Sequence, residues 1–115
     1  MSIIRSVTDS ALMQANEVKF QISEIAYALP HNEQFQVRKR MLELINNLDG
    51  QIIDAFALSN KIDRVRKFVN IVGKLMECKD YLEYVQKSSN IIIGNTFSKI
   101  DELSNLLLIN SGTLN

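Results

Sequence analysis

Proline and glycine are scarce in this sequence, which has one proline and four glycines among 115 residues. An all-β protein needs many tight turns, and those turns are built largely from these two residue types. Alanine, leucine, isoleucine, lysine, glutamate and glutamine fill the long segments between the few breakers, and this composition favours helices. A chain of this length has no room for two independent cores. The sequence therefore predicts a single all-α domain.

Long apolar runs and paired cysteines are also missing. No stretch approaches the roughly 20 apolar residues that a membrane-spanning helix needs, and residues 1–5 do not lead into an apolar stretch of signal-peptide length. Cys78 is the only cysteine, so no disulfide can form within the chain. These features are typical of a cytoplasmic protein, and they predict no membrane contact.

The sequence lacks the residue patterns of known catalytic and metal centres. His31 is the only histidine, and there is no Glu-x-x-His pair of the kind that di-iron bundles use. Nucleophile-elbow, phosphate-binding-loop and zinc-ligand spacings are absent as well. Cys78 lies at the predicted end of a helix, where the helix dipole opposes a thiolate. We therefore interpret Cys78 as a structural residue and predict no enzyme activity, no cofactor and no metal.

Apolar residues recur at alternating steps of three and four in four segments, as expected for amphipathic helices. The predicted helices span about residues 7–29, 32–58, 61–78 and 80–108, and a frayed C-terminal tail follows. Such helices with short connections predict an antiparallel up-down-up-down four-helix bundle. The predicted core rows of the first three helices are Ala11, Ala15, Val18, Ile22, Ile25 and Leu29; Met41, Ile45, Leu48, Ile52 and Ala55; and Ile62, Val65, Val69, Val72 and Met76, with Phe68, Ile71 and Leu75 widening the third.

Several residues mark the ends of these helices. Pro30 stops the first, because proline disfavours helical geometry in the residue before it. The predicted N-terminal caps are Asn32 with Glu33 for the second helix, Ser59 or Asn60 for the third, and Asp80 for the fourth.

Two stretches can be read in more than one way. The Asp-Gly pair ending at Gly50 is a turn signal, yet Leu48 and Ile52 continue the core row in phase across it. One helix over 32–58, weakened or bent at Gly50, is the favoured interpretation. The three isoleucines at 91–93 have local strand preference, but no partner strand or hairpin signal accompanies them, so we predict a helix there.

The overall charge is balanced, with thirteen basic and thirteen acidic residues, so there is no global attraction to nucleic acid. The basic residues nevertheless gather in the second and third predicted helices. On neighbouring antiparallel helices they would form one basic surface that can pair with phosphates. An ordinary solvated helix face, partly neutralised by Asp49, Asp54 and Asp63, is the alternative. The basic residues in question are Arg38, Lys39, Arg40, Lys61, Arg64, Arg66, Lys67 and Lys74.

Several short motifs resemble a bacterial family over about residues 15–105. The chain is similar to the four-helix-bundle family of S23-like proteins, which are encoded in rRNA intervening sequences. Its closest branch is the accessory variability determinant of diversity-generating retroelements. The matching motifs are ALPHNEQF at 28–35, RKRM at 38–41, RVR at 64–66, Leu75, a DYLEY turn at 80–84 and Gly94.

This resemblance implies a non-catalytic accessory protein that assembles as a homopentamer. Such a protein binds a reverse transcriptase and template RNA or RNA/DNA during mutagenic retrohoming. The basic residues that match the family's pattern, or lie next to it, become candidate nucleic-acid contacts: Arg38, Arg40, Arg64, Arg66 and Lys74. That branch of the family is markedly basic, whereas this chain is neutral.

The alternative function is a generic protein-binding or self-assembling four-helix bundle without a nucleic-acid role. Leu12, Met13, Phe20 and Phe56 lie off the predicted core rows. Exposed together, these side chains would form an apolar patch of the kind that marks interfaces. They could equally widen the core.

Overall fold

The computed structural model describes residues 3–30, 35–89 and 91–111, with side chains from Ser6 onward. Over these residues the chain forms five helices and no strand, which confirms the all-α prediction. The helices are α1 (Ile3–Ala28), α2 (Phe35–Ile45), α3 (Leu48–Ala57), α4 (Lys61–Ser88) and α5 (Thr96–Ser111).

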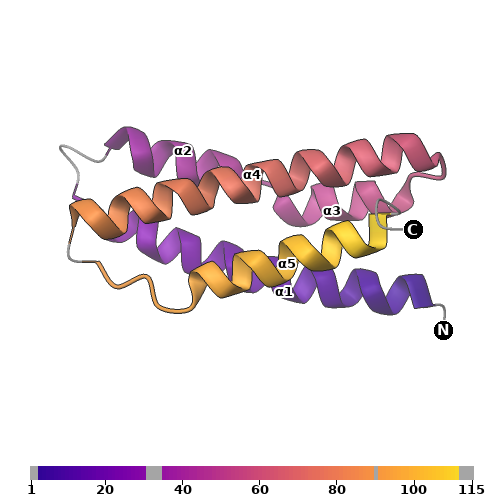
Figure 1. Cartoon of the computed structure of the whole chain (residues 1–115), viewed down its shortest axis with the longest axis horizontal. Helices are drawn as coiled ribbons and strands as arrows, with labels where there is room; N and C mark the ends of the chain where they lie inside the picture. The colour runs from indigo at the N-terminus through magenta and orange to yellow at the C-terminus, as the bar shows by residue number, and fades with distance from the viewer. Residues whose placement is uncertain (1–2, 31–34, 90, 112–115) are drawn as a thin grey trace.

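The helices are arranged as four rods, because α2 and α3 lie end to end (Figure 1). α1 packs against α5 and against both α2 and α3, and α4 packs against the same three helices. The four rods therefore close into a ring, which is a four-helix bundle measuring 46 × 23 × 21 Å. The start of α1 and the end of α5 lie at the same end of the bundle in Figure 1, as they do in an up-down-up-down order.

The first two predicted core rows are buried in full. Every predicted position on α1 and on the α2–α3 rod belongs to one continuous apolar cluster. Removing such side chains from water contributes about 1.5–3 kcal/mol for each large residue. These rows therefore fix which faces of the two rods point inward.

The rod predicted as one helix over 32–58 is in fact broken, so that interpretation was wrong. Asn46 and Asn47 separate α2 from α3, and Asn47 adopts a left-handed conformation with φ 58° and ψ 29°. A Cβ at Gly50 would overlap the Oδ1 of Asn47, because the Asn47 side chain folds across the first turn of α3. Gly50 thus provides room for the break, which lies at Asn47 and not at Gly50 itself.

The boundary predicted near residues 78–80 does not exist. α4 continues unbroken to Ser88, and Asp80 lies within it instead of capping a new helix. The reason is a buried row that runs straight through the predicted boundary at steps of three and four, and residues 74–88 contain no proline or glycine. Its members are Phe68, Ile71, Leu75, Cys78, Leu82 and Val85.

The same row corrects the predicted core face of the third helix. Ile62 and Val69 are exposed, whereas Phe68, Ile71 and Leu75, predicted only to widen the core, are its centre. α4 carries apolar residues on two overlapping faces, and packing against the other rods selects one. The start of α4 is as predicted: the Asn60 Oδ1 accepts a hydrogen bond of 3.1 Å from the backbone N–H of Asp63.

Residues 91–93, predicted as helix, form an irregular segment before α5. Ile93 is buried while Ile92 is exposed, so this segment places Ile93 in the core. Gly94 then takes φ 65°, a left-handed conformation that glycine adopts without strain. The Thr96 hydroxyl lies 2.7 Å from the Gln21 Oε1 and 2.9 Å from the Ile93 carbonyl oxygen, which fixes this segment against α1.

Three predictions fall partly or wholly outside the described residues. His31 and the capping pair Asn32 and Glu33 lie there, as do positions 112–115 of the tail. At the other end of the first helix, α1 already begins at Ile3. Within the described ranges, we find no helix with the length and apolarity that crossing a lipid bilayer demands.

Candidate nucleic-acid interface

The five predicted contact residues do not form a single cluster. Arg38 and Arg40 lie on α2, whereas Arg64, Arg66 and Lys74 lie on α4. Only Arg66 and Lys74 line a common groove. The basic surface predicted across both segments is therefore divided into parts with different surroundings.

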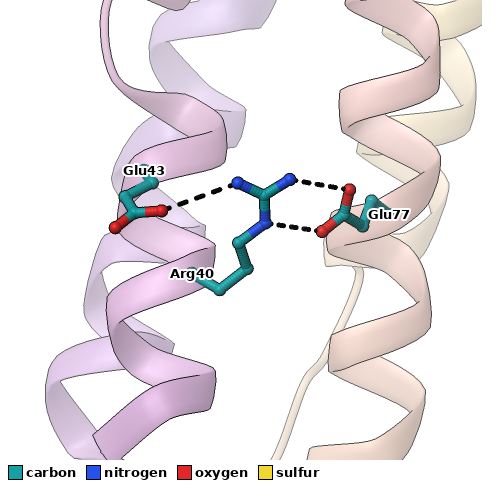
Figure 2. Close-up of polar contacts among 3 residues, drawn as sticks. All are labelled: Arg40, Glu43 and Glu77. Carbon is teal, nitrogen blue, oxygen red and sulfur yellow. Dashed lines mark hydrogen bonds and ion pairs between the residues drawn. The ribbon is translucent and has the colours of Figure 1, made fainter.

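Arg40 is held by two carboxylates. Its Nε donates to the Glu77 Oε2 at 2.7 Å, its Nη2 donates to the Glu77 Oε1 at 3.1 Å, and its Nη1 lies 3.5 Å from the Glu43 Oε2 (Figure 2). The hydrogen bonds to Glu77 raise the pKa of the Arg40 guanidinium, and those bonds lower the pKa of the Glu77 carboxyl. Arg40 thus joins α2 to α4, with its donors directed at protein carboxylates.

Arg64 and Arg38 are also partly taken up by the fold. The Arg64 Nη1 donates to the backbone oxygen of Leu58 at 3.2 Å, which ties the start of α4 to the end of α3. Arg38 is half-buried on α2. Neither residue lines the groove that holds Arg66 and Lys74.

That groove is an open, polar channel of about 490 Å³ between α3 and α4, which we call the α3–α4 groove. Helical spacing explains its composition, because residues three and four apart share one face of a helix. Three residues come from α3 and its N-terminal cap, and five come from α4. The lining residues are Asn47, Gln51, Asp54, Asp63, Arg66, Lys67, Asn70 and Lys74.

One hydrogen bond crosses the groove and shows which residues of α3 and α4 lie opposite each other. The Lys74 Nζ donates to the Gln51 Oε1 at 3.1 Å. Asn47 stands one turn before Gln51, at the break between α2 and α3. The left-handed turn at Asn47 therefore determines where the α3 wall of the groove begins.

The charges in the groove are not paired with one another. Arg66, Lys67 and Lys74 supply three cations, and Asp54 and Asp63 supply two carboxylates. None of these five groups takes part in any of the ion pairs within 4.0 Å found among the described residues. The groove thus presents both signs of charge to solvent, with an excess of one positive charge.

Two lysines elsewhere on the bundle behave differently. The Lys79 Nζ lies 2.9 Å from the Asp101 Oδ1, which links α4 to α5. The Lys99 Nζ lies 2.8 Å from the Glu17 Oε1, which links α5 to α1, and this hydrogen bond raises the pKa of Lys99. These two lysines therefore connect rods through ion pairs, whereas the three cations of the groove form no ion pair among the described residues.

Lys67 was not among the five predicted contacts, although it lies in the basic run of the sequence. Its position follows from spacing: it is seven residues before Lys74, which places both on the same face of α4. The signal was therefore present in the sequence, but choosing this face required knowing where α3 packs.

A second surface feature lies on α1. Met13, Phe20 and Tyr27 repeat every seven residues, with 73%, 62% and 67% of their surfaces exposed. We call these three residues the α1 stripe. Met13 and Phe20 were predicted as patch residues, whereas Tyr27 was not.

The other two predicted patch residues belong to the margin of the core. Leu12 and Phe56 are half-buried and pack against the apolar cluster. The rings of Phe56 and Phe68 meet edge to face, with centroids 4.9 Å apart and an angle of 78° between the planes. These two side chains widen the core, which the sequence offered as the alternative to an exposed apolar patch.

Cys78 is buried in the row that α4 turns inward. Burial raises the pKa of its thiol to about 12, and the nearby Glu77 carboxylate adds to this effect. Over the part of the chain that the structure describes, no three histidine, cysteine, aspartate or glutamate residues gather as a metal site would require.

One motif behind the family resemblance has a different structure from the one expected. The DYLEY segment at 80–84 was matched to a turn, but it lies in the second half of α4. Gly94, another matching position, was predicted within the helix over 80–108, but it lies outside a helix, two residues before α5 begins at Thr96.

Comparisons of this chain with protein-family models, with curated proteins and with solved structures give no match.

Proposed function

We propose that this chain is a non-catalytic accessory protein that binds single-stranded RNA along the α3–α4 groove. The observation that carries the proposal is the presence of Arg66, Lys67 and Lys74 in one open groove, none of them in an ion pair. Cations in this state can each neutralise a phosphate and release its counterion. Arg40 acts indirectly, by holding α2 against α4.

The partner in this proposal is the reverse transcriptase of a diversity-generating retroelement, which the chain would assist during mutagenic retrohoming. The resemblance of the sequence supports this part. In the up-down-up-down order that we propose for the bundle, α3 and α4 are consecutive antiparallel helices. Their charged faces then form the two walls of a continuous track for an RNA strand.

The test measures binding of a short single-stranded RNA by fluorescence anisotropy at two salt concentrations. Three phosphate contacts predict that affinity falls about 20-fold between about 50 mM and 200 mM salt. The double variant Arg66→Gln/Lys67→Gln leaves one contact, so its affinity falls only about threefold over the same range.

The matched control is Lys39→Gln/Lys87→Gln, which removes the same charge from exposed positions outside the groove. We expect this control to keep the salt dependence of the unchanged protein. No binding at low salt, with and without the reverse transcriptase, would contradict the proposal.

The second candidate function is a self-assembling, protein-binding bundle without a nucleic-acid role. The α1 stripe favours it, because large apolar side chains aligned on one exposed helix face are typical of interfaces. A homopentamer is the assembly that the resemblance implies. It would have about five times the 13.1 kDa mass of the chain.

Light scattering at micromolar concentration tests this candidate. We expect the unchanged protein to form the oligomer and Phe20→Ser to dissociate it. Ile109→Ser is the control, since Ile109 is a similarly exposed apolar residue on α5. A 13.1 kDa monomer for the unchanged protein would contradict the assembly.

A further inference from the structure

The α3–α4 groove contains two carboxylates that phosphate binding does not explain. Asp54 and Asp63 line the same groove as the three cations, without pairing with them. A phosphate in the groove would be repelled by both carboxylates. A groove that bound only phosphates would therefore bind them more tightly if the two carboxylates were absent. Each carboxylate thus needs its own explanation.

Asp63 has an explanation in the fold. It lies in the first turn of α4, where a negative charge is stabilised by the helix dipole. Its backbone N–H also takes part in the cap with Asn60. Asp63 therefore contributes to the start of α4 whether or not the groove binds anything.

Asp54 has no such role. It lies in the last turn of α3, which ends at Ala57, and there the helix dipole disfavours a negative charge. Its side chain is exposed, and no ion pair within the described residues involves it. A carboxylate that the local helix disfavours and no cation neutralises is available to a ligand.

The position of Asp54 relative to the three cations follows from which residues of α3 and α4 lie opposite each other. The hydrogen bond between Gln51 and Lys74 joins the half of the groove that has no carboxylate. Asp54 stands one helical turn, about 5 Å, further along α3, toward the half that contains Lys67 and Arg66. A ligand lying along the groove thus contacts the Lys74 cation, which is flanked by amide side chains. One helical turn further along, it contacts the Asp54 carboxylate, which accepts hydrogen bonds.

A ribonucleotide matches this order of groups. Its phosphate is an anion, and its 2′-hydroxyl is a hydrogen-bond donor that deoxyribose lacks. An ionised aspartate only accepts hydrogen bonds, and aspartate is a known partner of the ribose 2′-hydroxyl in nucleotide sites. A volume of about 490 Å³ falls within the range of small-molecule sites.

We propose that, within the RNA strand bound along the α3–α4 groove, one ribonucleotide lies with its phosphate beside Lys74 and its 2′-hydroxyl donating to Asp54. This inference rests on the proposed RNA-binding function and adds that the groove distinguishes RNA from DNA. Asp54 lowers the affinity for any strand through charge repulsion. It restores affinity only when a 2′-hydroxyl is present to donate.

The test compares three single strands of one sequence, made as RNA, as DNA and as 2′-O-methyl RNA, by fluorescence anisotropy with the full chain. The unchanged protein should bind RNA about tenfold more tightly than DNA, as expected for one hydrogen bond to a charged group. The 2′-O-methyl strand should behave like DNA, because its 2′-oxygen cannot donate.

The deciding variant is Asp54→Ala, which should bind all three strands with similar affinity. It should keep the fold, because Asp54 is exposed and alanine is a better helix former; circular dichroism checks this. Asp63→Ala is the matched control, and its preference for RNA should persist.

Equal binding of RNA and DNA by the unchanged protein would overturn the inference, as would an RNA preference that survives in Asp54→Ala. The proposed function would still hold in both cases. If none of the strands binds at low salt, the proposed function itself fails, and the inference fails with it.

Discussion

Arg40 on α2 and Glu77 on α4 form a two-bond ion pair at 2.7 and 3.1 Å across 37 residues of sequence (Figure 2). Fork-shaped pairing of this kind fixes orientation as well as distance. α2 has only 11 residues, which is too short for a stable isolated helix. The ion pair therefore adds a directed contact to the apolar packing that holds α2 in the bundle.

The first prediction concerns the pH dependence of this pair. The pKa of Glu77 is lowered in the fold from 4.5. Its contribution to stability is therefore present above pH 4.5 and is lost as the pH falls through the folded pKa. Glu77→Gln should lower Tm by a few degrees at neutral pH, and the difference from the unchanged protein should close in acid. Glu83→Gln, at an exposed site on α4, is the control. An equal decrease in Tm in both variants would contradict a specific role for Glu77.

The second prediction concerns the left-handed residue between α2 and α3. Asn47→Val should reduce the free energy of unfolding by about 1–2 kcal/mol, because a β-branched residue tolerates this conformation poorly. Asn47→Gly should leave stability close to that of the unchanged protein. Urea denaturation measures these changes. Asn46→Val, one residue earlier and also exposed, should have a clearly smaller effect, and a similar loss would mean that the backbone at Asn47 is not the cause.

The third prediction concerns the core face of α4. Phe68 is fully buried, so Phe68→Ala should lower the free energy of unfolding by about 3–5 kcal/mol. Val69→Ala changes the next residue, which is half exposed, and should be nearly neutral. Chemical denaturation monitored by circular dichroism compares them. If Val69→Ala lowered the free energy of unfolding as much as Phe68→Ala, then α4 would turn its Val69 face toward the core.

The fourth prediction concerns the thiol of Cys78. Its pKa in the fold is about 12 against a usual 9.0, so the native thiol should react with maleimide far more slowly at neutral pH than after unfolding in guanidinium. The fold favours the neutral thiol, and this contribution to stability is present below pH 9.0 and is lost as the pH rises toward 12. Reaction at the rate of an exposed cysteine would show that this face of α4 is open.

The sequence was informative where one row of apolar residues stood alone. Every residue of the predicted α1 row is buried, because its steps of three and four run unbroken from Ala11 to Leu29, whereas the α1 stripe recurs only every seven residues. On α4 two apolar rows overlap, and the row through Ile62 and Val69 was as regular as the row that is buried. Periodicity cannot choose between two such faces, because the choice depends on which other rods are present.

The candidate site was predictable only in part, for a related reason. The basic character of Arg66 and Lys74 is visible in the sequence, and both line the groove. That Arg40 would be occupied by Glu77 is a contact between distant residues, which no local pattern reports. Asp54 looked like a neutralising charge on a solvated face until its position near the end of α3 was known.

The break at Asn47 also bears on the order in which the backbone opens. α2 and α3 have 11 and 10 residues, below the roughly 12–15 that a helix needs to persist alone. α4, with 28 residues, lies well above that length. In amide hydrogen exchange, we expect α3 to exchange before the centre of α4, although the two form opposite walls of one groove. An RNA strand bound along that groove would then slow amide exchange first in α3.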